Sequence, residues 1–163
     1  MTESERPPPA SVRIDEEPPT SRDAQYCLSE YYRELSHRFA SGFDPAQSLS
    51  PSLDEFLPPD GSFLVMRLDD EPVGCGGFKR NSPDAAYLKR MWVASSVRGL
   101  GLGRRLLEAL EEQARSRGYG KVQLETNESL EEAQQLYRKC GYREVAPFND
   151  EAYAHYWFEK PLT

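Results

Sequence analysis

The chain has 163 residues, a length typical of one domain with a self-sufficient hydrophobic core. Its 27 Asp and Glu residues outnumber its 20 Lys and Arg residues, and the net charge of −7 argues against a nucleic-acid-binding surface. No apolar run approaches the roughly 18 residues that span a bilayer, and the N-terminus lacks the apolar segment of a secretory signal. The three cysteines lack metal-ligand or redox spacing, so we expect reduced thiols, a cytoplasmic protein and no metal site.

The N-terminal region divides into a tail and the start of one domain. Residues 1–9 contain three consecutive prolines and are expected to be disordered, which leaves 10–163 as a single domain. A short strand is predicted over Ser11–Ile14. From Thr20 onward, apolar residues recur at three- and four-residue steps, which predicts an amphipathic helix. These residues are Ala24, Cys27, Leu28, Tyr31 and Leu35.

The middle of the chain has the pattern of an antiparallel meander. Three strands are predicted, over Ser62–Leu68, Val73–Lys79 and Ala86–Val93, and turn sequences separate them. A glycine-rich segment follows at 98–103. After it, a stripe of leucines predicts a helix that ends before Gly118.

The last third of the chain alternates strand and helix. Lys121–Thr126 is a predicted strand, and Ser129 with Glu132 has the spacing of a capping box that opens a second helix. Gly141 is expected to end that helix in the left-handed conformation. Two further strands are predicted, around Tyr142–Val145 and Ala152–Lys160. This order predicts an α/β fold with a mixed central sheet of about six to seven strands flanked by helices.

The glycine-rich segment is the most specific functional signal in the chain. Between a predicted strand and a predicted helix stands Arg98-Gly99-Leu100-Gly101-Leu102-Gly103-Arg104. Glycines let a ligand approach the backbone, and free N–H groups at a helix start favour phosphate oxygens. The spacing fits neither the dinucleotide fingerprint nor the Walker pattern. It fits R-x-x-G-x-G, the pyrophosphate loop of acyl-coenzyme A transferases; the alternative is a glycine turn that only caps the helix.

The stretch from Lys89 to Gly141 resembles the GNAT superfamily of N-acetyltransferases. The motifs stand in the family's order: K-R-M-W-V at Lys89–Val93, R-G-L-G-L-G-R-R-L-L at Arg98–Leu107, L-E-T at Leu124–Thr126 and A-Q-Q-L-Y-R-K-C-G-Y at Ala133–Tyr142. The segment Phe148–Lys160 is similar to a branch of bacterial small-molecule acetyltransferases. The resemblance implies the GNAT acyl-CoA N-acyltransferase fold and acetyl-CoA as co-substrate. It also implies acetyl transfer to the primary amine of a small molecule by direct attack in a ternary complex.

The resemblance also implies roles for residues at the coenzyme. The pantetheine arm is expected between the strand before the loop and the next parallel strand, where it pairs with exposed backbone. That backbone belongs to Met91, Trp92 and Val93. Asn127 would bind the pantetheine or cap its own loop. Tyr137 would hydrogen-bond the coenzyme sulfur and protonate the leaving thiolate, or else pack in the core.

The residue that removes a proton from the amine is left open by the sequence. Related branches carry a glutamate four residues before the M of K-R-M-x-V, and this chain has Tyr87 there. A water chain, Glu125 or His155 is the alternative base. Histidine is a common base near neutral pH, but the predicted strand face of His155, shared with Tyr153 and Trp157, favours a structural histidine.

The acceptor side is expected to be lined from the first helix by Tyr31, Tyr32 and Arg38, together with Tyr87, although a solvated helix face explains the helical residues equally well. Two other functions stay open, the first because a carboxylate is missing at position 87 and the second because the surface is acidic. One is a catalytically degenerate acyl-CoA-binding sensor, and the other is an interaction module. A homodimer is the family-level expectation.

Overall fold

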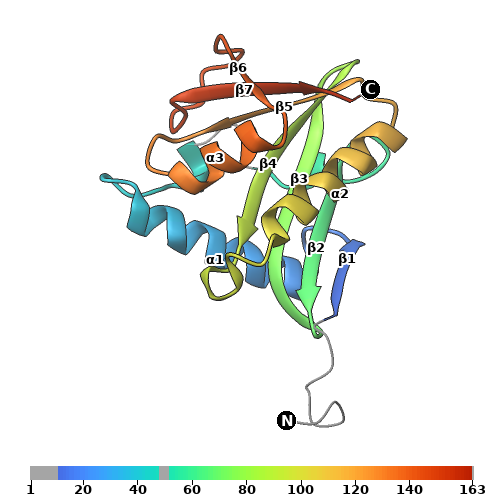
Figure 1. The fold of residues 1–163 in the computed structure, drawn as a ribbon, viewed down its shortest axis with the longest axis vertical. Helices are drawn as coiled ribbons and strands as arrows, with labels where there is room; N and C mark the ends of the chain where they lie inside the picture. The colour runs from blue at the N-terminus through green and yellow to red at the C-terminus, as the bar shows by residue number, and fades with distance from the viewer. Residues whose placement is uncertain (1–10, 48–51, 163) are drawn as a thin grey trace.

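The computed structural model describes residues 11–47 and 52–162, so the tail expected over residues 1–9 lies outside the described residues. In this part of the chain, seven strands form one mixed sheet in the order β1-β2-β3-β4-β5-β7-β6, and helices pack against it (Figure 1). The predicted α/β fold, with a mixed sheet of six to seven strands flanked by helices, is confirmed. No helix among these residues is long and apolar enough to cross a bilayer.

The first half of the sheet is an antiparallel meander, as predicted. Its elements are β1 (Val12–Glu16), α1 (Arg22–Arg38), η2 (Pro45–Gln47), η3 (Asp54–Phe56), β2 (Ser62–Leu68), β3 (Glu71–Ser82) and β4 (Ala85–Val93). Ser21 caps α1, because its side-chain oxygen accepts a hydrogen bond from the Ala24 N–H at 3.2 Å. The strand predicted near residue 11 is confirmed as β1, which adds antiparallel to β2 at the sheet edge.

The second half places the remaining strands beside β4. Its elements are η4 (Ser95–Val97), α2 (Leu102–Ser116), β5 (Lys121–Thr126), α3 (Glu131–Lys139), β6 (Arg143–Val145) and β7 (Tyr156–Pro161). β5 runs parallel to β4, and β7 runs antiparallel to both β5 and β6. Gly141, just after α3, has a φ of +95°, the left-handed conformation expected at that end.

Two sequence predictions in this half are wrong. Ser129 does not cap α3: the helix begins at Glu131, and the side chain of Asn127 accepts the Ser129 N–H at 2.9 Å instead. Glu132 does not reach back to a cap, because its carboxylate pairs with Arg38 at 2.8 Å. The last strand begins at Tyr156 rather than near residue 152, so His155 lies in the preceding loop and not on a strand face with Tyr153.

The core lies on both faces of the sheet, and alternate residues of β2 separate the two sides. Leu64 and Met66 belong to the cluster under α2 and α3, whereas Phe63 and Val65 belong to the cluster under α1. Buried leucines of α2 fill the first cluster: Leu102, Leu106, Leu107 and Leu110. This packing fixes the start of α2, and therefore the glycine-rich segment before it, against the sheet.

Candidate active site

A cleft opens where β4 and β5 stop pairing. Their parallel ladder joins Ala85 to Lys121, and it ends at Tyr87 opposite Gln123. Beyond that point the residues of β4 from 88 to 93 and those of β5 and its extension from 124 to 127 line a cavity of about 610 Å³. The separation of these two strands, expected from the resemblance, is confirmed.

A bulge in β4 turns its backbone within the cleft. Cys75 pairs with Trp92 while Gly77 pairs with Lys89, so β4 carries one extra residue in this interval. Arg90 has a φ of +61°, which is unusual for a residue other than glycine. The bulge leaves the residues on either side, including Met91, in the cleft wall.

The glycine-rich segment forms an open cradle at one end of the cleft. Gly99 and Gly101 have φ values of +91° and +75°, and an added Cβ at either residue would meet no described heavy atom within 4 Å. Gly101 is also the N-cap of α2, so the N–H groups of the first helical turn are directed at this space. The residues present therefore fit a pyrophosphate group.

The arginines around this cradle already have partners. Arg98 pairs with the Glu34 carboxylate of α1 and donates to the Val93 carbonyl at 3.2 Å. Arg104 pairs with Glu108, one turn further along α2, at 3.1 Å. Both arginines line the cleft, and a pyrophosphate bound by Arg98 would compete with Glu34 for its guanidinium.

Three charged side chains, each at most 6% exposed, form the floor of the cleft at its other end. The Lys89 Nζ lies 3.5 Å from an oxygen of Glu125 and 3.3 Å from an oxygen of Glu151. Burial raises the pKa of Glu125 above its usual value, and the positive charge of Lys89 opposes this shift. Burial likewise lowers the pKa of Lys89, against the pull of both carboxylates.

Glu125 has one oxygen engaged and one open. The Tyr87 hydroxyl donates a hydrogen bond to Oε1 of Glu125 and accepts one from the Asn149 amide at 3.0 Å. The other oxygen, Oε2, is buried and accepts no hydrogen bond from any described residue. A buried carboxylate oxygen of this kind is a site for an incoming proton donor.

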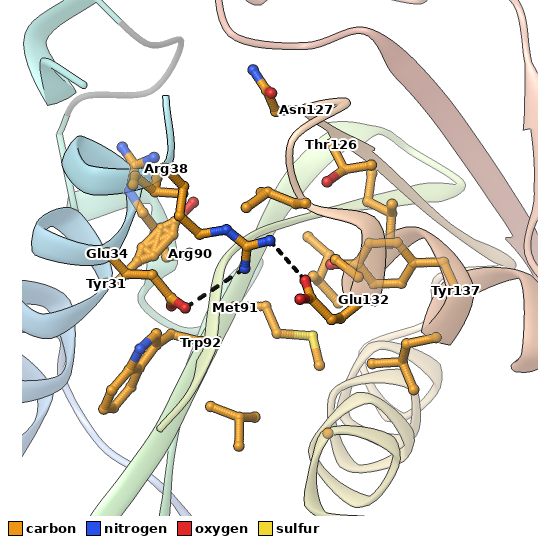
Figure 2. Close-up of a pocket in the computed structure, with 18 of the residues that line it drawn as sticks. Tyr31, Glu34, Arg38, Arg90, Met91, Trp92, Thr126, Asn127, Glu132 and Tyr137 are labelled. Carbon is orange, nitrogen blue, oxygen red and sulfur yellow. Dashed lines mark hydrogen bonds and ion pairs between the residues drawn. The ribbon is translucent and has the colours of Figure 1, made fainter. Parts of the chain in front are cut away.

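Tyr137 of α3 lies on the wall opposite α1. It is 7% exposed and lines the cleft, and Figure 2 shows it on the side of Thr126 and Glu132, across from Tyr31. Burial and the negative charge of Glu125 raise the pKa of Tyr137 above 10, so its hydroxyl stays protonated at neutral pH.

Arg38 joins the two walls of the cleft. Its guanidinium extends from α1 toward α3, where it donates to the Ser129 carbonyl and to the Glu132 carboxylate, both at 2.8 Å (Figure 2). It also lies 3.8 Å from Glu34 on its own helix. The Arg38 hydrogen bond holds the pKa of Glu132 below its usual value.

Comparison with known proteins agrees with this geometry. The family model described as "Acetyltransferase (GNAT) family" matches residues 26–142. This chain belongs to the GNAT acetyltransferase family. It is 37% identical to an IAA acetyltransferase of Azospirillum brasilense, over 68% of this chain and 74% of that protein. It is 29% identical to the uncharacterized N-acetyltransferase YjgM of Escherichia coli, over 72% of this chain and 75% of that protein.

Solved GNAT structures share the fold. A GNAT-family acetyltransferase of Staphylococcus aureus superposes with a TM-score of 0.78 at 21% identity, over 94% of this chain and all of that one. An aminoglycoside 6′-N-acetyltransferase complexed with coenzyme A superposes with a TM-score of 0.68 at 20% identity, over 93% and 97% of the two chains. The protein is an N-acetyltransferase with the GNAT fold, and acetyl-CoA-dependent acetyl transfer is its general chemistry.

The structure brings most of the predicted site residues of this GNAT protein to one cleft and leaves four outside its lining. The cleft is lined by Tyr31, Arg38, Met91, Trp92, Val93, Arg98, Gly99, Gly101, Leu102, Gly103, Arg104, Glu125, Asn127 and Tyr137. Leu100 is 63% exposed, and Tyr32 packs against the buried Arg90 instead. Tyr87 lies beneath the lining, bonded to Glu125.

His155 is the remaining predicted residue outside the cleft lining. It is exposed, and its Nδ1 accepts the Glu128 N–H at 3.0 Å. The Asn127 side chain accepts the Ser129 N–H of its own loop at 2.9 Å and donates to the Tyr153 carbonyl of the loop before β7 at 2.7 Å. The contact with Glu128 favours the structural interpretation of His155, and the contact with Ser129 favours the loop-capping interpretation of Asn127.

Sequence reasoning missed the aromatic side of the cleft and Glu151. Phe39 and Phe43 line the cavity although both lie after α1 has ended. Four-residue steps from Tyr31 and Leu35 point to Phe39 at the end of the helix, but they do not place Phe43, which lies in the loop beyond it. Glu151 has no comparable signal, since only the folded chain brings it to Lys89.

Proposed function

We propose that this GNAT enzyme transfers the acetyl group of acetyl-CoA to the primary amine of a small molecule. The amine attacks the thioester directly in a ternary complex. The observation that supports this most strongly is the buried carboxylate of Glu125, whose Oε2 accepts no hydrogen bond from the described residues while Tyr87 bonds its other oxygen. Because the three cysteines are buried and none forms a disulfide, a reducing compartment suits the chain, and we propose the cytoplasm.

The coenzyme would be held by backbone more than by side chains. Gly99 and Gly101 would admit the pyrophosphate to the N-terminus of α2, with Arg98 as a charged donor. The pantetheine arm would lie along Met91–Val93, where β4 no longer pairs with β5 and its backbone is open to an added strand.

Glu125 would act as the general base. The amine attacks in its neutral form, and its nitrogen gives one proton to the Glu125 carboxylate as the new C–N bond forms at the carbonyl carbon. The C–S bond then breaks, and the coenzyme leaves as a thiolate. A pKa raised by burial suits this role, because it makes Glu125 a stronger base than an exposed glutamate.

Tyr137 would act as the general acid for the leaving thiolate. Its hydroxyl donates a hydrogen bond, and finally a proton, to the departing sulfur. The raised pKa of Tyr137 makes it a weak acid at first, in part because of the charge on Glu125. When Glu125 takes the amine proton, that charge disappears and Tyr137 becomes a better acid. Base and acid are thus coupled in the order that the reaction needs.

The test is transfer itself. Purified protein is incubated with acetyl-CoA and a panel of primary amines, thiol release is followed, and acetylated amine is identified by mass spectrometry. We expect one thiol released for each amine acetylated. Coenzyme binding without thiol release for any amine would contradict the proposal and support the sensor function; loss of coenzyme binding altogether would support an interaction module.

A further inference from the structure

One end of the cleft has an aromatic wall, formed by Tyr31, Phe39, Phe43 and Tyr153. Phe43 and Tyr153 lie 4.6 Å apart between ring centroids, and Phe39 stacks on Tyr153 at 5.6 Å. Tyr31 meets Phe43 edge-to-face at 6.4 Å. The rings come from α1, from the segment after it and from the loop before β7, so the fold assembles one continuous apolar surface from distant parts of the chain.

This wall is only partly covered by the protein. Tyr31, Phe43 and Tyr153 are each of intermediate burial, and all three line the cleft. Uncovered aromatic surface inside a cleft is stabilised by an apolar ligand that displaces water from it. A ring or compact hydrocarbon is the group that such a surface accepts best, because aromatic pairs gain energy beyond their buried area.

The aromatic wall is tied to the catalytic carboxylate. The Asn127 side chain donates to the Tyr153 carbonyl at 2.7 Å, which fixes the wall beside the end of β5. Asn127 follows Glu125 by two residues, a path of about 7 Å along an extended chain. Glu125 and the aromatic wall line the same cleft, so one ligand can place its nitrogen near Oε2 of Glu125 and a ring on the wall.

Charged groups at this end are already matched with one another. Lys89 lies between Glu125 and Glu151, and Arg38 pairs with Glu132 and approaches Glu34. The exception is Oε2 of Glu125, which accepts no hydrogen bond from the described residues. Among the described residues, the carboxylates that line this end are each paired with Lys89 or Arg38, so a second positive charge on a ligand would have to compete for them.

Resting on the proposed acetyl transfer, we infer that the acceptor is a monoamine whose primary amino group is joined by a short linker to an apolar ring. Its N–H group donates to Oε2 of Glu125, and its ring packs on Phe43 and Tyr153. Polyamines fit less well because they bring a second positive charge and leave the aromatic wall uncovered. Small hydroxylated amines fit less well because they also leave that wall uncovered.

The test compares three amines as acceptors: 2-phenylethylamine, ethanolamine and spermidine. We expect kcat/KM for 2-phenylethylamine to exceed that for either of the others by about 10- to 100-fold, the factor that burial of one apolar side-chain-sized group yields. Equal or better use of ethanolamine or spermidine would overturn the inference while leaving the proposed amine acetylation intact.

Substitutions at Phe43 test whether the ring of the acceptor packs on the aromatic wall. Phe43→Ala should lower kcat/KM for 2-phenylethylamine by about tenfold or more, while ethanolamine turnover and the Kd of coenzyme A change little. Phe43→Leu keeps apolar volume at this position and should lose part of the preference. Tyr26→Ala removes an aromatic residue that is 49% exposed and lies outside the cleft lining. This control should leave kcat/KM unchanged for both amines. Equal losses for both amines in Phe43→Ala would overturn the inference.

A binding measurement separates this inference from the proposed function. Calorimetry follows 2-phenylethylamine and then ethanolamine titrated into protein saturated with coenzyme A. Tighter, Phe43-dependent binding of 2-phenylethylamine without any acetyl transfer in the turnover assay would support the ring site and overturn the proposed function. Binding of 2-phenylethylamine that is no tighter than that of ethanolamine would overturn the ring site.

Discussion

The hydroxyl of Tyr87 on β4 donates a hydrogen bond to the carboxylate of Glu125 on β5, next to the point where these parallel strands separate. Tyr87 stands where the family resemblance implies a glutamate in related branches. The neighbouring strand therefore supplies a carboxylate beside the position where the chain lacks one. This contact favours Glu125 over a water chain or the exposed His155 as the base.

Replacing Tyr87 with Phe should shift the pH dependence of the reaction. The Tyr87 hydrogen bond opposes the rise in the pKa of Glu125, so its loss raises that pKa further. Because the base works as a carboxylate, the acidic limb of the kcat profile should move to higher pH. Tyr119→Phe, which removes a hydroxyl bonded to the Asp60 carbonyl away from the cleft lining, is the control. An unchanged pH profile of kcat in Tyr87→Phe would show that the Tyr87 hydroxyl does not affect the pKa of the base.

Gly101→Glu should abolish acetyl-CoA binding while the protein still folds. The new side chain and its charge would occupy the open space before α2, where the pyrophosphate is proposed to lie. Gly118→Glu is a matched control, because Gly118 also has a positive φ, +93°, and open space around it, but it lies beyond the far end of α2. Both variants carry the same type of backbone strain. Calorimetry that finds unchanged coenzyme affinity in a folded Gly101→Glu variant would contradict the placement of the pyrophosphate.

Tyr137→Phe should lower kcat by about 10²-fold, the low end of general acid effects, since burial makes this phenol a weak acid. The Kd of acetyl-CoA should change much less, because the proton is needed in the transition state. Tyr142→Phe removes a hydroxyl bonded to the buried Glu111 at 2.8 Å outside the cleft lining. That control should lower Tm and leave kcat unchanged. A loss of kcat below about threefold in Tyr137→Phe would leave Tyr137 with a packing role only.

Glu34→Gln should strengthen coenzyme binding. The Glu34 carboxylate pairs with Arg98, and we expect it to compete with the pyrophosphate for the guanidinium. Partly exposed ion pairs are worth about 0.2–1 kcal/mol, so the Kd of coenzyme A should fall by up to about fivefold. Arg98→Ala should weaken binding, and the double variant should resemble Arg98→Ala. Weaker binding in Glu34→Gln would show that Glu34 orients Arg98 rather than competing for it.

Local sequence signals predicted the framework of this protein because each depends on residues close together in the chain. The leucine stripe of α2 and the glycines before it were predicted correctly for this reason. The cap of α3 was not: the helix has no side-chain cap, and the side chain of Asn127 bonds the Ser129 N–H in the loop before it. Short polar side chains compete for such caps, and only the loop conformation decides among them.

The contacts at the site depend on pairs that lie far apart in the sequence. Glu125 reaches Tyr87 only because of the register in which β5 adds to β4. Phe43 meets Tyr153 across more than 100 residues, through a loop and not through a repeating pattern. Periodicity identifies which face of an element is apolar, but not which distant residue covers that face.

The most direct measurement is the pH dependence of kcat for the native enzyme and for Glu125→Gln, at saturating acetyl-CoA and amine. We predict that the native enzyme loses activity at acidic pH as Glu125 is protonated. In Glu125→Gln that inflection disappears and kcat falls by about 10²–10⁴-fold, with the Kd of acetyl-CoA nearly unchanged. Retention of the inflection in Glu125→Gln, together with its loss in His155→Ala, would contradict the account.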